Sequence, residues 1–141
     1  MQKIILLICA VLMISTVANA CGGITITGKS GKSYCLSKFT MNWYTAYAWC
    51  KDQSMDLIEL GTTCGTNVGT CSELALSSDE QNNIKEKGIT IDLVWTNTSN
   101  SASYAYYVNL SSGNFYNLKA RSVNGDYALC YESPLPNQKI R

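Results

Sequence analysis

The chain has 141 residues, a formal net charge of +1 and no histidine. This length suits one domain with a modest core and is too short for two domains of ordinary size. The balanced charge, without a basic stripe, argues against nucleic acid and anionic membrane surfaces as partners.

Residues 1–20 have the pattern of a secretory signal peptide. Lys3 precedes the apolar run Ile4 to Ile14, and small and polar residues lead to Ala20. The apolar run is shorter than the roughly twenty residues that cross a bilayer, and we expect no transmembrane segment in the rest of the chain. The protein is predicted to be secreted or extracytoplasmic, in a periplasm or at a cell surface.

Cleavage after Ala20 would remove Cys9 and leave an even number of cysteines in the exported chain. An even set in a small exported domain predicts three disulfide bonds, although the sequence alone does not choose among the pairings. No two of them have the two-residue spacing of a zinc ribbon, so we expect no metal site. The six cysteines are Cys21, Cys35, Cys50, Cys64, Cys71 and Cys130. In the alternative that Cys21 carries a bacterial lipid anchor, one cysteine would be left unpaired, and Ala18 stands where such sites usually have leucine.

The N-terminal half is predicted to contain a hairpin and a helix. Residues 22–34 alternate β-branched residues with Gly and Lys, which is typical of a hairpin. Asn42 is positioned to cap a helix on which Trp43, Ala46, Tyr47 and Cys50 share one face, and this face is predicted to point into the core. A short strand at residues 57–60 follows, and then a loop at 61–70 in which Cys64 could bond Cys71 and close a small ring.

The C-terminal half is predicted to be a second short helix followed by a β-meander. Ser77 or Ser78 can cap the helix, and Gly88 follows its last residue. The period of the apolar residues then changes to two. The expected strands are residues 89–96, 104–110, 114–118 and 126–132, and the tail 133–141 is expected to be flexible.

These elements occur in the order found in C-type-lectin-like domains. Trp43, Ala46 and Cys50 match the first helix of that family, Trp95 its tryptophan-containing strand, and Leu129-Cys130 its closing strand. The chain resembles this family over roughly residues 34–132, and its segment 106–113 is similar to the bacterial branch found in exported and pilin-like envelope proteins. The resemblance implies one compact α+β domain at residues 21–132, with two short helices and a small antiparallel sheet stapled by disulfides.

The resemblance also implies a disulfide pairing. Cys50 would bond Cys130 and Cys21 would bond Cys35, which leaves Cys64 and Cys71 as the third pair.

Calcium-dependent sugar binding in that family uses Glu-Pro-Asn or Gln-Pro-Asp and Trp-Asn-Asp triplets, because calcium takes six to eight oxygen ligands. None of these triplets is present. Asn124 and Asp126 could supply two ligands, but Asn-Gly-Asp is more often a turn that opens a strand. We therefore expect no metal and no cofactor.

The sequence also gives little support for catalysis. It lacks histidine, which is the most common general base, and its exported cysteines are expected to be bonded. Asp52 and Asp56 are spaced i, i+4 at the end of the first predicted helix, which usually indicates a solvated helix edge. We expect that the protein is not an enzyme.

Tyrosines and asparagines gather in the predicted C-terminal strands, a mixture that suits sugar rings and protein partners alike. Alternation along residues 104–110 places Tyr106 and Tyr107 on opposite faces, so at least one row is expected to pack in the core. The candidate ligand-binding residues are Asn97, Asn100, Tyr107, Asn114 and Tyr116.

The predicted function is therefore a binding module that recognises an extracellular protein or glycan without calcium. The alternative is a structural or assembly subunit of an envelope or pilin-like appendage. The sequence does not determine the ligand or the oligomeric state.

Overall fold

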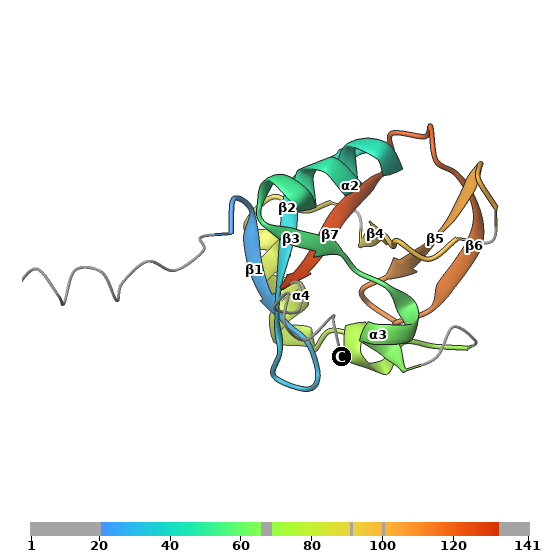
Figure 1. Cartoon of the computed structure of the whole chain (residues 1–141). Helices are drawn as coiled ribbons and strands as arrows, with labels where there is room; N and C mark the ends of the chain where they lie inside the picture. The colour runs from blue at the N-terminus through green and yellow to red at the C-terminus, as the bar shows by residue number, and fades with distance from the viewer. Residues whose placement is uncertain (1–20, 66–68, 91, 100, 133–141) are drawn as a thin grey trace, which may run out of the picture.

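A computed structural model of the chain describes residues 21–65, 69–90, 92–99 and 101–132 (Figure 1). The predicted signal peptide, Asn100 and the predicted flexible tail at 133–141 lie outside the described residues. The described part is an α+β fold with one mixed sheet, helices and three disulfides. None of its helices has the length and apolar character needed to cross a bilayer.

The centre of the sheet is β7 (Asp126–Glu132), the last strand that the structure describes. The predicted hairpin is formed by β1 (Ile24–Thr27) and β2 (Ser33–Met41), which pair antiparallel. β2 also pairs with β7, and β3 (Met55–Leu57) pairs with the same strand. Every residue of β7 except the last is buried, as expected for a strand covered on both faces.

The other half of the sheet corrects the predicted meander. β4 (Leu93–Trp95), β5 (Tyr104–Asn109) and β6 (Phe115–Ala120) pair antiparallel in sequence order. The chain then crosses back, so β7 lies between β2 and β4 and runs parallel to β4. The prediction of an antiparallel sheet is therefore wrong for this pair, because β7 is not joined to β4 by a hairpin but returns beside it after β5 and β6.

The first helix begins where the sequence predicts. α2 (Trp43–Asp52) is capped by Asn42, whose Oδ1 accepts a hydrogen bond from the Thr45 backbone N–H at 2.8 Å. Ala46 and Cys50 are fully buried against the sheet. Tyr47, predicted to face the core, is instead 37% exposed and stacks on Trp43.

The prediction of two helices is incomplete, because the described residues contain three. α3 (Leu60–Cys64) is a single turn that begins at the last residue of the predicted strand 57–60 and continues into the segment predicted as a loop, and η1 (Ser72–Leu74) is a short 3-10 turn. α4 (Ser78–Glu86) is the second predicted helix, and the Ser77 hydroxyl caps it. Leu60 is fully buried, and its backbone N–H donates to Thr98 Oγ1 at 2.9 Å. A contact from a distant loop thus stabilises a turn whose Gly and Thr residues have low helix propensity.

The predicted disulfides all form. Cys50 bonds Cys130 and thereby ties α2 to β7, Cys21 bonds Cys35 beside β2, and Cys64 bonds Cys71. The sulfur of Cys21 is used in this bond, so it is not open to lipid attachment in this arrangement.

A half-buried carboxylate, that of Glu73, holds the β1–β2 turn. Glu73 in η1 accepts hydrogen bonds from the Ser30 backbone N–H at 2.7 Å, from the Ser30 hydroxyl at 2.6 Å and from the Tyr34 hydroxyl at 2.7 Å. Burial alone would raise the pKa of Glu73, but these donors outweigh it and hold the pKa below its usual value of 4.5. The ionised form of Glu73 therefore stabilises the fold.

We expect Glu73→Gln to lower the free energy of unfolding by about 1–2 kcal/mol at neutral pH, because the bonds to Ser30 and Tyr34 lose their charge. A group whose pKa is lowered by folding stabilises above its unfolded pKa, and this contribution disappears as the pH falls through the folded pKa. The stability difference between the variant and the wild type should therefore shrink as the pH falls below 4.5 and vanish below the lower pKa that Glu73 has in the folded state. Urea titrations at several pH values measure this, with the exposed Glu86→Gln as the control; a gap that persists in acid would contradict it.

Candidate functional site

The β5–β6 hairpin carries one sheet face that no described helix covers. On that side of the sheet, α2 packs on β3 and β7, and the hairpin extends beyond it (Figure 1). Trp95, Tyr107 and Tyr116 are direct cross-strand partners from β4 to β6, so their side chains share this face. Exposure rises along the row, from fully buried at Trp95 to 46% at Tyr116. We call the outer part of this surface, formed by Tyr107, Tyr116 and Lys119, the tyrosine face.

The two tyrosine rings form a stacked pair. The ring centroids of Tyr107 and Tyr116 are 5.2 Å apart, and the ring planes differ by 28°. The pairing of β5 with β6 holds the two rings against each other. The rings therefore lose little side-chain entropy when a ligand binds.

Lys119 joins the tyrosine face because of an irregularity in the ladder. The register between β5 and β6 shifts between Ala105 and Tyr107, where one extra residue of β6 is accommodated. The bulge keeps Lys119 on the same side as Tyr116. The Lys119 ammonium lies 4.0 Å from the centroid of the Tyr107 ring, which is a cation–π contact.

Asp126 fixes the position of that ammonium. Its Oδ1 lies 2.6 Å from Lys119 Nζ, and its side chain is fully buried at the start of β7. Burial raises the pKa of Asp126, and the hydrogen bond and charge of Lys119 oppose this shift. Burial, followed by the negative charge of Asp126, also raises the pKa of Tyr107 above its usual value of 10.0.

The loop beside the hairpin is held by Arg121. Its guanidinium lies 4.2 Å from the Trp43 ring centroid, and its Nη2 donates to Ser99 Oγ at 2.6 Å and to the Ser101 carbonyl at 3.1 Å. These contacts attach the loop after β4 to the end of β6 and to the start of α2. Ser99 and Ser101 are therefore held beside the end of β6 that carries Lys119.

The structure brings together two of the five residues predicted to bind a ligand. Tyr107 and Tyr116 are in contact, whereas Asn114 lies at the turn end of the hairpin and accepts a hydrogen bond from Thr70 Oγ1 at 3.0 Å. Asn97 lies near the opposite end, where its backbone N–H donates to the Ile58 carbonyl at 2.6 Å. The structure does not describe Asn100. The predicted site thus spans both ends of the hairpin, and its tyrosines alone form a cluster.

The ion pair between Lys119 and Asp126 was not predicted from the sequence. Their sequence separation gives no signal, because the contact depends on β7 crossing back into the sheet. Asp126 was considered as a calcium ligand, but it is buried and bound to Lys119, while Asn124 is exposed. Within the described ranges, no three His, Cys, Asp or Glu side chains are grouped so that they could hold a metal ion.

The carboxylates considered for catalysis do not share a helix. α2 ends at Asp52, and Asp56 lies in β3, where it forms an ion pair with Lys51. The prediction that Asp52 and Asp56 lie on one helix is therefore wrong. The chain leaves α2 at a tight turn in which Ser54 adopts a φ of 60°.

No protein-family model matches the chain, and no curated protein shows significant similarity to it. The resemblance to C-type-lectin-like domains therefore stays a prediction from the motifs.

Proposed function

We propose that the protein is an exported, non-catalytic module that binds an extracellular protein or glycan through the tyrosine face, without calcium. The observation that carries this proposal is the stacked pair of Tyr107 and Tyr116 on an uncovered sheet face, beside an ammonium held in place by a buried carboxylate. Three disulfides suit a chain that works in an oxidising compartment.

The chemistry of the tyrosine face suits recognition. Tyrosine presents a flat apolar ring and a hydroxyl, and it is enriched where binding energy is concentrated in interfaces. Tyr116 is 46% exposed and is therefore accessible to a ligand ring or side chain. Lys119 adds a hydrogen-bond donor whose position does not have to be ordered on binding, because Asp126 already orients it.

We expect Tyr116→Ala to weaken ligand binding by about 1–4 kcal/mol, since it removes the exposed ring of the stacked pair. Stability should change little, because the ring is nearly half exposed. A glycan array identifies a glycan ligand, and titration calorimetry with that glycan measures the loss.

Tyr104→Ala is the matched control. Tyr104 is on the same hairpin and is 42% exposed, but it alternates with Ala105 and Tyr107 and so belongs to the opposite face of β5. Equal losses for the two variants, or no loss for Tyr116→Ala, would contradict the assignment of the site.

We expect millimolar calcium to leave both the melting temperature and ligand binding unchanged. Asp126 is committed to Lys119, and a ligand stabilises a fold only if the folded state binds it. Melting curves and array binding in calcium and in chelator measure this, and a calcium-dependent rise of several degrees would contradict the calcium-independent mode.

A further inference from the structure

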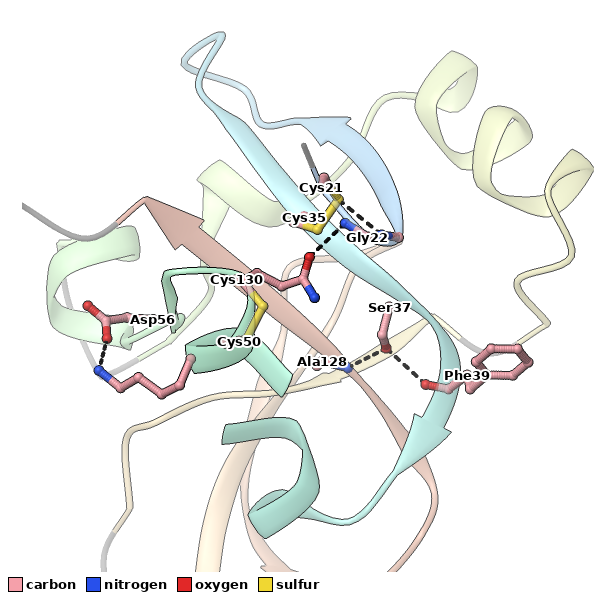
Figure 2. The surroundings of a disulfide bond; sticks show 12 residues. Cys21, Gly22, Cys35, Ser37, Phe39, Cys50, Asp56, Ala128 and Cys130 are labelled. Atoms are coloured by element: carbon pink, nitrogen blue, oxygen red, sulfur yellow. Dashed lines mark hydrogen bonds and ion pairs between the residues drawn. A yellow bond between two sulfur atoms is a disulfide. The ribbon is translucent and has the colours of Figure 1, made fainter. Parts of the chain in front are cut away.

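Two disulfides lie side by side on the face of the sheet that α2 covers (Figure 2). Cys35 in β2 and Cys130 in β7 are direct partners in the antiparallel ladder. Directly opposed residues project to the same face. Cys35 is bonded to Cys21, and Cys130 is bonded to Cys50, so four sulfur atoms gather around one ladder position.

The two opposed cysteines meet the geometric requirement for a bond to each other. Directly opposed residues of an antiparallel pair have Cα atoms about 4.5–5.5 Å apart. Disulfides need a Cα separation of about 4.4–6.8 Å, and the existing bonds have 5.6 Å and 5.5 Å. A Cys35–Cys130 bond therefore requires no large movement of the backbone. The loop it would close is similar in length to that of Cys50–Cys130, so chain entropy does not strongly favour either bond.

A cavity gives access to this group. It has a volume of about 190 Å³, and its lining includes Cys21, Cys35 and Cys130. Of the four cysteines, Cys21 is partly exposed, whereas the other three are at most 1% exposed. A thiol from solvent therefore reaches the sulfur of Cys21 first. Attack there makes Cys35 the leaving thiolate, because exchange proceeds by displacement at one sulfur of the disulfide.

We propose that this cavity is a thiol-exchange site for a small-molecule thiol, with Cys35–Cys130 as a built-in alternative disulfide. In the first step the incoming thiolate bonds to Cys21, and the Cys21–Cys35 bond breaks. In the second step the Cys35 thiolate bonds to Cys130, and the Cys50–Cys130 bond breaks. The proton of the incoming thiol ends on Cys50, and the number of disulfide bonds is unchanged, so neither an oxidant nor a further reductant is needed.

The exchange changes how the fold is tied together. α2 loses its covalent bond to β7, while β2 gains one to the same strand. This inference concerns a different part of the molecule from the tyrosine face and does not depend on the proposed ligand binding.

The test uses the full exported protein and reduced glutathione. After incubation, free thiols are alkylated with iodoacetamide and disulfides are mapped by mass spectrometry without reduction. The expected product carries glutathione on Cys21, a Cys35–Cys130 bond and an alkylated Cys50. An adduct on Cys21 with alkylated Cys35 and an intact Cys50–Cys130 bond would overturn the proposal, as would the absence of an adduct on Cys21.

Two single variants test the same bond without an added thiol. Cys21→Ser leaves Cys35 free opposite Cys130, and Cys50→Ser leaves Cys130 free opposite Cys35. Both variants are expected to contain a Cys35–Cys130 bond, with Cys50 alkylated in the first and Cys21 alkylated in the second. Retention of the original bond in both would overturn the proposal. Cys64→Ser is the control, because the free Cys71 thiol it leaves is expected not to alter the other two disulfides.

Discussion

Replacing both Cys50 and Cys130 with alanine is expected to lower the free energy of unfolding by about 4 kcal/mol. The bond spans a sequence separation of 80 residues, so its loss restores much conformational freedom to the unfolded chain. Both sulfur atoms are fully buried between α2 and β7, and alanine leaves no unpaired polar group in their place. Urea denaturation of the oxidised protein measures the change.

The matched control is the double replacement of Cys64 and Cys71 with alanine. Their bond spans a separation of 7 residues, so the same reasoning predicts a smaller loss of about 2 kcal/mol. An equal or larger loss from this pair would show that local strain or packing, and not the length of the closed loop, sets the stabilisation.

Lys119→Met is expected to lower the free energy of unfolding by about 3–5 kcal/mol at neutral pH, because it leaves the buried carboxylate of Asp126 without its counter-ion. The double variant with Asp126→Leu should recover most of this loss, since it removes both charges. Lys38→Met, on an exposed residue of β2, should change stability by less than about 0.5 kcal/mol. A double variant as unstable as Lys119→Met would contradict the role of the unpaired charge.

The same variant should show a distinctive pH dependence. Burial raises the pKa of Asp126 above 3.8 in the folded state, so its ionised form costs stability at neutral pH and this cost is relieved as the pH falls through the folded pKa. Loss of Lys119 removes the opposing effect and raises the pKa further. The stability gap between the wild type and Lys119→Met should therefore narrow in acid, and a constant gap would contradict this explanation.

The two main helices could be predicted because their signals are local. Asn42 and Ser77 each cap a helix from the position at which the sequence places them. The alternation in β5 was also predicted correctly, since Tyr106 packs against the core while Tyr107 faces the other side. α3 could not be predicted, because the burial of Leu60 and its bond to Thr98 depend on a loop far along the chain.

The candidate site was predictable in its composition and unpredictable in its geometry. Tyr107 and Tyr116 stand out as tyrosines in strands, but their contact requires the register that the β-bulge sets. The asparagines looked equally suitable in the sequence, yet the hairpin separates Asn97 from Asn114. Composition identifies residue types, and only the strand register determines which of them meet.

The sequence by itself determined the α+β class, the starts of α2 and α4, the strands of the hairpins and the even set of cysteines, because periodicity, capping and composition act over short stretches of chain. The tertiary structure decided the rest. It placed β7 parallel to β4, paired Lys119 with Asp126 and set Cys35 opposite Cys130. These contacts form because the apolar strand β7 is buried between β2 and β4. Burial of a strand inside a sheet depends on segments that are far apart in the sequence, so no short stretch of chain predicts it.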